Sequence, residues 1–153
     1  MLQIRKATAT DGAMLHAIQR RAFAEDLIRY GDDPTCPANE SKARLLYKIR
    51  NSDYYVFFYS GTLIGGAQVA DLGGGSFRLN RIYIDPEYQN KGLGSALMAL
   101  LEANYPLARR FSLDTPHLNI RNHHFYEKLG YVKVGEYKYN DALTLFDFVK
   151  TIK

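Results

Sequence analysis

The stretch Arg81-Ile-Tyr-Ile-Asp-Pro-Glu-Tyr-Gln-Asn-Lys-Gly-Leu-Gly-Ser-Ala-Leu-Met-Ala-Leu-Leu-Glu102 joins a strand pattern to a helix pattern. Ile82–Ile84 is β-branched and aromatic, and Pro86 ends that run because proline cannot donate to a sheet ladder. Apolar residues then return at helical spacing until Pro106 stops them, at Leu93, Ala96, Leu97, Leu100 and Leu101. The pattern predicts a strand, a loop over Gln89–Gly94 and a helix.

Two glycines, Gly92 and Gly94, lie in this loop at the mouth of the helix. Glycine lets the backbone approach a ligand closely, and the first N–H groups of a helix are unpaired and backed by a positive dipole. The loop is therefore either an anion site, with phosphate as the expected anion, or a tight connection without a ligand. It is not a dinucleotide loop, which needs a third glycine where Leu97 lies, nor a P-loop, which ends in Gly-Lys-Ser/Thr.

A second stretch, Leu113-Asp-Thr-Pro-His-Leu-Asn-Ile-Arg-Asn-His-His-Phe-Tyr-Glu-Lys-Leu-Gly-Tyr131, reads as a strand, a turn and a helix. It holds Asn119 and, further on, the run Phe125–Tyr131. The loop fits Gln/Arg-x-x-Gly-x-Gly/Ala, and this stretch fits Asn followed by Phe/Leu-Tyr-x-Lys-x-Gly-Phe/Tyr. In this order the two motifs resemble the GNAT superfamily of acetyl-CoA-dependent N-acetyltransferases.

The resemblance implies an α/β (α+β) fold, with a mixed, mostly antiparallel central sheet of about seven strands and about four flanking helices. We expect one domain over residues 1–153. The local patterns agree, with strands at 2–6, 53–59, 62–72, 77–84, 111–114, 131–139 and 142–150. Helices are expected after Thr10-Asp11, over 41–51, after Gly92 and over 121–129, where Gly130 closes the last one. Residues 24–40 look irregular.

By resemblance, acetyl-CoA is the co-substrate and no metal is required. Its pyrophosphate would be held by the loop and the residue after it: Gln89, Asn90, Lys91, Gly92, Leu93, Gly94 and Ser95. The backbone of Ile82, Tyr83 and Ile84 would pair with the pantetheine arm like an added strand and polarise the thioester carbonyl. Asn119 and Tyr126 would contact the same cofactor.

Acetyl transfer to an amine also needs a base and an acid. A lysine-like ammonium with a pKa of about 10.4 is almost fully protonated near neutral pH, so a base must remove a proton. Asp114 is the first candidate, at the place where ribosomal-protein N-terminal acetyltransferases of the family carry a glutamate; its shorter side chain would need a bridging water. Glu25 and Glu87 are the alternatives, and Asp114 could instead cap the next turn. Tyr126 is the family's general acid, or else a core tyrosine.

Composition bounds the remaining possibilities. The chain has 153 residues, 46% of them apolar and 24% charged, which is ordinary for a globular domain. It lacks an apolar run of membrane length and a signal-peptide pattern, and its single Cys36 excludes an internal disulfide, so we expect a cytoplasmic protein. The net charge of +4 comes from scattered basic residues, which disfavours a nucleic-acid partner. The four histidines show no metal-ligand spacing.

The acceptor amine is not specified by any motif. The segment 24–40 carries five carboxylates and only one arginine, Arg29: Glu25, Asp26, Asp32, Asp33 and Glu40. It is either solvated surface or part of the acceptor site, in which case the acceptor is a cationic small amine or a basic peptide. A non-catalytic acyl-CoA-binding sensor of the same fold is the rival interpretation. The oligomeric state is left open, a homodimer included.

Overall fold

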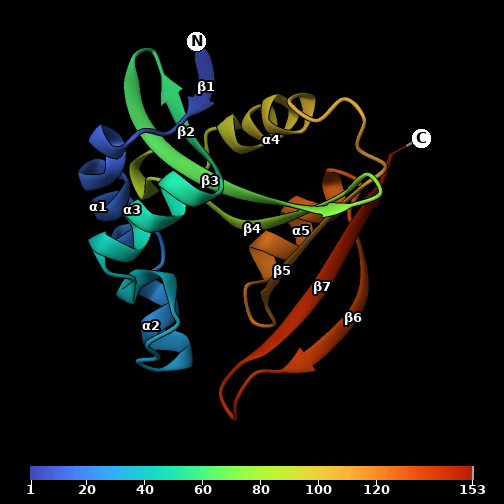
Figure 1. Ribbon diagram of the computed structural model, residues 1–153. Helices are drawn as coiled ribbons and strands as arrows, with labels where there is room; N and C mark the ends of the chain where they lie inside the picture. The colour runs from blue at the N-terminus through green and yellow to red at the C-terminus, as the bar shows by residue number, and fades with distance from the viewer. Residues whose placement is uncertain (153) are drawn as a thin grey trace. The chain divides into compact units, whose positions relative to one another are not determined.

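The computed structural model describes residues 1–152, and its seven strands form one sheet in the order β1-β2-β3-β4-β5-β7-β6 (Figure 1). β4 and β5 pair in parallel, whereas β1–β2, β2–β3, β5–β7 and β6–β7 are antiparallel. The strands are β1 (Leu2–Lys6), β2 (Asp53–Tyr59), β3 (Thr62–Gly73), β4 (Ser76–Ile84), β5 (Arg110–Pro116), β6 (Val132–Lys138) and β7 (Thr144–Thr151). The predicted α/β fold with a mostly antiparallel sheet is confirmed.

The chain divides into two compact units. The first unit holds Met1–Val69 and Arg81–Pro106, and the second unit holds Ala70–Asn80 and the described chain from Leu107 onward. The single domain expected over residues 1–153 stays a prediction. No helix within residues 1–152 is long and apolar enough to cross a membrane.

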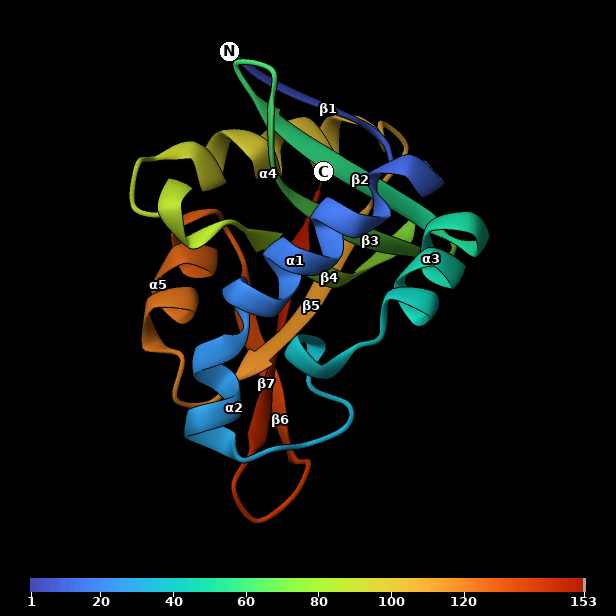
Figure 2. The same ribbon diagram turned by 90° about the vertical axis from the view of Figure 1, so that its left-hand side faces the viewer.

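Residues 1–152 form five α-helices: α1 (Gly12–Ala22), α2 (Ala24–Tyr30), α3 (Lys42–Asn51), α4 (Leu93–Ala103) and α5 (Ile120–Lys128). Four of them were predicted, but the irregular structure expected over residues 24–40 is wrong at its start. There α2 follows directly from α1 (Figure 2). Its first turn carries Glu25 and Asp26 and its last turn carries Arg29, an order that suits the helix dipole.

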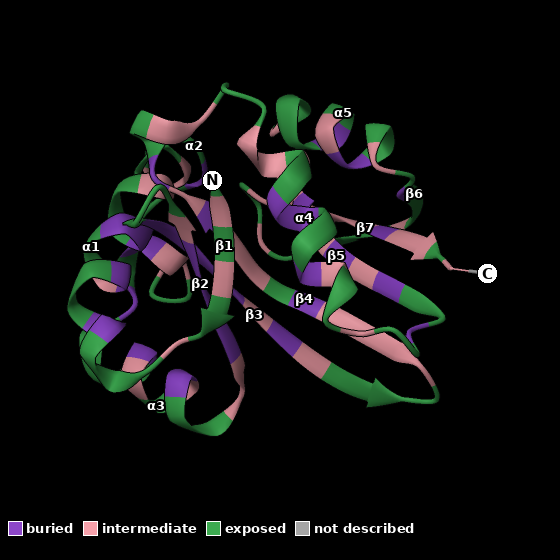
Figure 3. Ribbon diagram, turned by 90° about the horizontal axis from the view of Figure 1, so that it is seen from above, coloured by how far each residue is buried: buried purple, intermediate pink, exposed green. Residues whose placement is uncertain are grey.

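In the first unit, helices cover both faces of β2, which is why four consecutive residues, Tyr54–Phe57, are buried. Figure 3 shows α1 and α3 on one side of β1–β3 and α4 on the other. Alternate residues of a strand point to opposite faces. Tyr55 points towards the side of α4, and its ring lies 6.3 Å from that of Tyr105, which follows the helix. On the other face, Tyr54 and Val56 pack in a core with Leu15, Ile18, Leu45 and Ile49.

The buried face of α4 differs slightly from the predicted one. Leu97, Met98 and Leu101 are buried, whereas Leu100 is 37% exposed. With 3.6 residues per turn, Met98 and Leu100 lie on opposite flanks of the line through Leu97 and Leu101. The packing of the first unit buries the Met98 flank, which the sequence pattern alone did not distinguish.

In the second unit, α5 packs on one face of the β5–β7 pair. The register places Leu113 opposite Phe148, and the Tyr126 ring lies 6.3 Å from Phe148. His123 stacks on Phe146 of the same face at 5.0 Å. α5 ends as predicted before Gly130, whose φ of +99° belongs to the left-handed region that favours glycine.

Strand β5 is longer than expected, and this changes the position of Asp114. The strand runs to Pro116 because its pairing with β7 continues to Leu145. Asp114 therefore lies within the strand, and the interpretation that it caps the following turn is wrong. Its register partner is Asp147, so both carboxylates lie on the face of the β5–β7 pair opposite to α5.

Candidate active site

The loop after β4 is tied to the first unit at its beginning. It starts with the 3-10 turn Pro86–Tyr88, and the preceding Asp85 accepts a hydrogen bond from Arg21 Nη2 at 2.6 Å. The Gln89 side chain donates to the carbonyl oxygen of Ile84 at 2.9 Å. These bonds hold the base of the loop against β4 and α1, so the rest of the loop starts from a fixed position.

The mouth of α4 offers free backbone donors. Within the described chain, no hydrogen bond leads from the N–H groups of residues 91–95 to a protein acceptor. Gly92 is the N-cap, with φ +76°, and a Cβ built on it would meet no atom within 4 Å. Lys91 is exposed, with its Nζ 5.7 Å from the centre of the Tyr88 ring. This is the geometry of an anion site, with the positive end of a helix dipole behind it; its ligand stays a prediction.

The segment Ile82–Ile84 lies at the end of β4 in the first unit. Tyr83 is buried, and its hydroxyl is 2.8 Å from that of Tyr54. Burial is the main cause that raises the pKa of Tyr83 well above its ordinary value, so this hydroxyl stays neutral. In the second unit, the parallel pairing of β4 with β5 covers Ser76–Arg78. That pairing does not continue to the next two described residues of β4.

Tyr126 projects from α5 into the core of the second unit, where its ring also contacts Tyr131 at 5.8 Å. It is only 7% exposed, yet its hydroxyl has no hydrogen-bond partner within residues 1–152. Burial raises the pKa of Tyr126, and the charge of Asp114 raises it further. The residue is therefore a neutral, uncommitted proton donor. Asn119 is the N-cap of α5, and its carbonyl oxygen accepts from Asn122 N at 3.0 Å.

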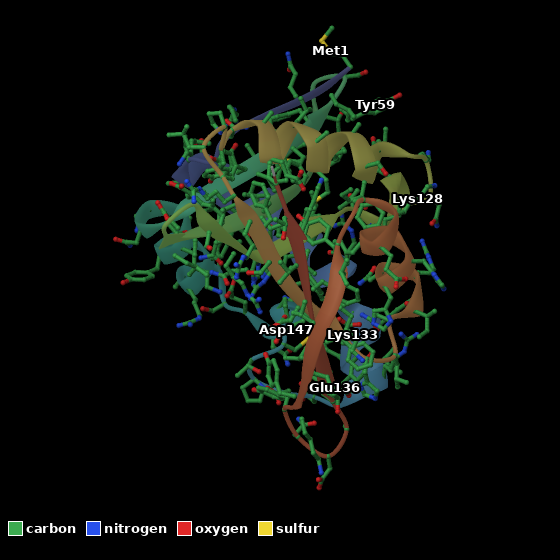
Figure 4. The ribbon with its side chains drawn as sticks, turned by 90° about the vertical axis from the view of Figure 1, so that its right-hand side faces the viewer. Met1, Tyr59, Lys128, Lys133, Glu136 and Asp147 are labelled. Atoms are coloured by element: carbon green, nitrogen blue, oxygen red, sulfur yellow. The ribbon has the colours of Figure 1, made fainter. Side chains whose placement is uncertain are left out.

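Asp114 belongs to a charged cluster that the sequence analysis did not anticipate. Arg78 Nη2 lies 2.9 Å from Asp114 Oδ2 and 3.2 Å from Asp147 Oδ1. The Tyr137 hydroxyl donates to Asp114 Oδ2 at 2.9 Å. Two carboxylates directly opposite each other on paired strands repel, and Arg78 offsets that repulsion. Figure 4 labels Asp147 on β7, beside β6 with Lys133 and Glu136.

The acidic segment contributes one carboxylate to the interior of the first unit. Glu40 is 8% exposed and accepts from Lys48 Nζ at 2.5 Å, Gln19 Nε2 at 3.1 Å and Arg81 Nη1 at 3.3 Å. Burial opposes the ionisation of Glu40, but the bonds and charges of these partners outweigh it and lower its pKa. The negative charge of Glu40 is thus balanced by mostly buried cations of the same unit, which sequence composition could not reveal.

Of the other acidic residues of the segment, Glu25 and Asp32 are exposed, and Asp26 and Asp33 are half-buried. Asp32 accepts from Asn39 Nδ2 at 2.8 Å, and Asp33 accepts from Thr35 N at 2.7 Å. Glu25 is exposed on α2. The alternative base Glu87 is exposed in the 3-10 turn of the loop, in the first unit like Glu25.

Three of the four histidines in the chain form hydrogen bonds with the backbone. His16 Nε2 lies 2.8 Å from the Glu40 carbonyl oxygen, and His123 Nε2 lies 3.0 Å from that of Pro116. His117 Nδ1 accepts from Thr144 N at 3.0 Å. Within the part of the chain that the structure describes, no group of three or more His, Cys, Asp or Glu side chains could hold a metal ion. Burial raises the pKa of the Cys36 thiol, which makes it a poor nucleophile.

The predicted site residues therefore fall into two sets. The loop and Ile82–Ile84 belong to the first unit, while Asp114, Asn119 and Tyr126 belong to the second. In the second set, the structure adds Arg78, Asp147 and Tyr137 around Asp114. No local sequence signal identifies these three, because strand pairing brings them together from three different strands.

A comparison with family models supplies the decisive observation: residues 14–131 match the model of the acetyltransferase (GNAT) family. The chain belongs to this family. The matched range contains both the loop before α4 and the Asn119–Tyr131 motif, so the resemblance seen in the sequence is confirmed. As a GNAT protein, it is an acetyl-CoA-dependent N-acetyltransferase. No curated protein sequence matches the chain.

Solved structures of GNAT proteins share the fold over the whole chain. The PaiA N-acetyltransferase of Thermoplasma acidophilum, solved with coenzyme A, is 23% identical, with a TM-score of 0.78 and 99% of each chain covered. A spermidine N-acetyltransferase chimera of Vibrio cholerae SpeG and hSSAT is 19% identical, with a TM-score of 0.78, covering 98% of this chain and 95% of the other. The ribosomal-protein-S18-alanine N-acetyltransferase of Escherichia coli is 20% identical, with a TM-score of 0.77. The match covers 100% of this chain and 95% of the other.

Proposed function

We propose that this GNAT acetyltransferase moves the acetyl group of acetyl-CoA directly to a primary amine of a small molecule or peptide. The observation that carries the proposal is the hydroxyl of Tyr126. A buried tyrosine hydroxyl normally finds a hydrogen-bond partner. Tyr126 has none within residues 1–152, and because the described chain contains no fully buried side-chain oxygen without a partner, its hydroxyl reaches solvent while its ring packs in the core. A protein that only binds acyl-CoA has no need of such a proton donor.

In the proposed reaction, the pyrophosphate of the co-substrate binds the loop Gln89–Gly94 and Ser95. The free N–H groups, the exposed Lys91 and the open space at Gly92 support this assignment. The pantetheine arm would lie along Ile82–Ile84 and near Asn119. The end of the β4–β5 pairing at Arg78 supports it, since an added strand needs an unpaired strand edge.

The amine nitrogen then attacks the thioester carbonyl, so that a C–N bond forms and the C–S bond breaks. One ammonium proton leaves to solvent through Asp114 and a bridging water. Tyr126 gives its proton to the leaving sulfur and is reprotonated by the second amine proton. Because burial keeps the pKa of Tyr126 high, it holds this proton at neutral pH.

The acceptor is proposed to be cationic. In the acidic segment Asp32 is exposed and Asp33 is half-buried, whereas the charge of Glu40 is neutralised by Lys48 and Arg81. The spermidine acetyltransferase that shares this fold acts on such an amine, and the surface carboxylates here could attract one.

The experiment is a screen of acetyl-CoA consumption across polyamines, amino acids, aminoglycosides and peptide N-termini, with release of the free thiol as the readout. We expect thiol release that depends on the amine, with an acetylated amine identified by mass spectrometry. Saturable CoA binding in calorimetry without thiol release on any amine would instead make the protein an acyl-CoA-binding module.

A further inference from the structure

Arg81 is the centre of a polar network in the first unit. Its side chain on β4 is 13% exposed. Nη1 donates to Oε1 of Gln19 on α1 at 3.2 Å and to Oε1 of Glu40 at 3.3 Å. Gln19 is fully buried and also donates to Glu40, at 3.1 Å. One nitrogen of the guanidinium is thus held firmly, which fixes the orientation of the whole planar group.

The opposite edge of the same guanidinium is unused. Within residues 1–152, neither Nε nor Nη2 of Arg81 has a hydrogen-bond partner. The described chain contains no fully buried side-chain nitrogen or oxygen without a partner, so both nitrogens reach solvent. An Nε–Nη2 edge presents two parallel N–H donors, the arrangement that binds a carboxylate through two hydrogen bonds.

The charges around Arg81 also favour an anion. Glu40 is the carboxylate of the network, and it faces two mostly buried cations, Arg81 and Lys48, whose side chain is 17% exposed. Burial is the main cause that lowers the pKa of Lys48. Arg44, which is 69% exposed, adds a third positive charge 3.8 Å from Glu40. A surplus positive charge in a poorly solvated place is costly until an anion balances it.

The position of the free edge connects it to the reaction. Arg81 immediately precedes Ile82–Ile84, the segment proposed to hold the pantetheine arm. Its guanidinium lies between α1 and the end of the acidic segment, the segment proposed to attract the acceptor. Side chains two residues apart on a strand share a face, so Arg81 lies on the same face of β4 as Tyr83.

We propose that the Nε–Nη2 edge of Arg81 binds a carboxylate of the acceptor, so that the acceptor is an amino-acid-like amine. This inference rests on the proposed function, because it assumes an amine acceptor, and it narrows the class. An amino acid with a second amine carries both the positive charge that the acidic segment favours and the carboxylate that Arg81 binds. A simple polyamine lacks the carboxylate.

The test uses acceptors that differ only at the carboxylate. Lysine is compared with cadaverine, which lacks the carboxylate, and with lysine amide, which replaces it by a neutral group of similar size. The best amine of the screen is compared with its own carboxylated or decarboxylated counterpart. We expect kcat/KM to favour the carboxylate by about ten- to a hundredfold, the scale of a hydrogen-bonded charge pair. Equal or better turnover of the decarboxylated amines would overturn the inference and leave the amine acetyltransferase activity standing.

Variants of Arg81 test whether its guanidinium is the group that binds the carboxylate. In Arg81→Gln the preference for lysine over cadaverine should disappear, and in Arg81→Lys, which keeps the charge and loses the planar edge, it should fall part of the way. Arg44→Gln is the matched control, because it removes an exposed arginine beside the same Glu40 and should keep the preference. Thermal unfolding checks that the variants fold. An unchanged preference in folded Arg81→Gln, or a loss of CoA affinity with an unchanged preference, contradicts the proposal.

Discussion

The side chain of Tyr126 combines a packed ring with an uncommitted hydroxyl, which separates its structural from its chemical contribution. Tyr126→Phe keeps the contacts of the ring with Tyr131 and Phe148 and removes the proton. Turnover should fall by about ten- to a thousandfold, the scale of losing a general acid, while the unfolding temperature and CoA affinity stay unchanged. Unchanged turnover, measured where chemistry limits the rate, would mean that Tyr126 is only a packing residue of the core.

The raised pKa of Tyr126 also sets the sign of a pH effect. A group whose pKa is raised keeps its proton to higher pH, so wild-type turnover should not fall through loss of this acid below about pH 10. If wild-type turnover falls with rising pH near neutrality and this fall is absent in Tyr126→Phe, the pKa of Tyr126 is low. Burial would then not raise it.

Asp114 and Asp147 form a natural pair of test and control, because the same Arg78 contacts both. An asparagine at either position keeps an oxygen that can accept from Arg78. If Asp114 is the base, Asp114→Asn should lower turnover more at neutral pH than at high pH, where the amine loses its proton unaided. Asp147→Asn should show no such trend. If the turnover of both variants, divided by that of the wild type, does not change with pH, Asp114 is a structural residue and not the base.

Among the elements, the loop and α4 together make the proposed cofactor site. Gly94 is the second residue of α4, where a bulky acidic side chain would occupy the space and charge expected of a pyrophosphate. Gly94→Glu should weaken CoA binding severely in calorimetry. Gly94→Ala, which suits a helix and adds only a methyl group, is the control for helix stability. Equal CoA affinity in wild type and Gly94→Glu removes the loop from the site.

The junction of β1 and α1 depends on Asp11, which is 7% exposed. Its carboxylate accepts from Arg5 Nη1 at 2.8 Å, Arg5 Nη2 at 3.0 Å and Thr8 N at 2.8 Å. The hydrogen bond from Arg5 is the main cause that lowers the pKa of Asp11. Asp11→Ala should lower the free energy of unfolding by about 1–2 kcal/mol, the scale of losing a helix cap.

The lowered pKa determines the pH window of this contribution. Asp11 stabilises the fold above the carboxyl pKa of the unfolded chain, about 3.9, and the stabilisation is lost as the pH falls through the lower pKa of the folded state. Urea titrations should therefore show the deficit of Asp11→Ala at pH 7 and a shrinking deficit towards pH 2. A deficit that is constant over this range would mean that the ion pair contributes nothing.

For the whole molecule, the distribution of charge tests the acceptor proposal. The protein is basic, with a net charge of +4, yet the acidic segment carries an exposed Asp32 and a half-buried Asp33. Asp32→Asn with Asp33→Asn should raise the KM for a cationic amine, and the effect should shrink in high salt. Asp71→Asn with Glu102→Gln changes the net charge equally outside the segment and should leave the KM unchanged. Identical KM values for both double variants would exclude the segment from acceptor selection.

Local patterns in the sequence determined the elements and the family. The change from strand to helix over Arg81–Glu102 is visible because alternation, proline and glycine act over a few residues. The same is true of β2, of the turn at Gly130 and of the motif around Tyr126. These features need no knowledge of distant contacts. The end of β4, the loop and α4 therefore appear in the structure nearly where they were predicted.

The tertiary structure decided which charges meet. Arg81 and Glu40 are far apart in sequence, and so are Arg78, Asp114 and Asp147, yet each group shares hydrogen bonds. Strand register and helix packing set these neighbours, and a register shift of one residue would turn each side chain to the other face. The neutralisation of Glu40, the free edge of Arg81 and the ion pair of Asp114 follow from that packing, because long-range contacts leave no local pattern in the sequence.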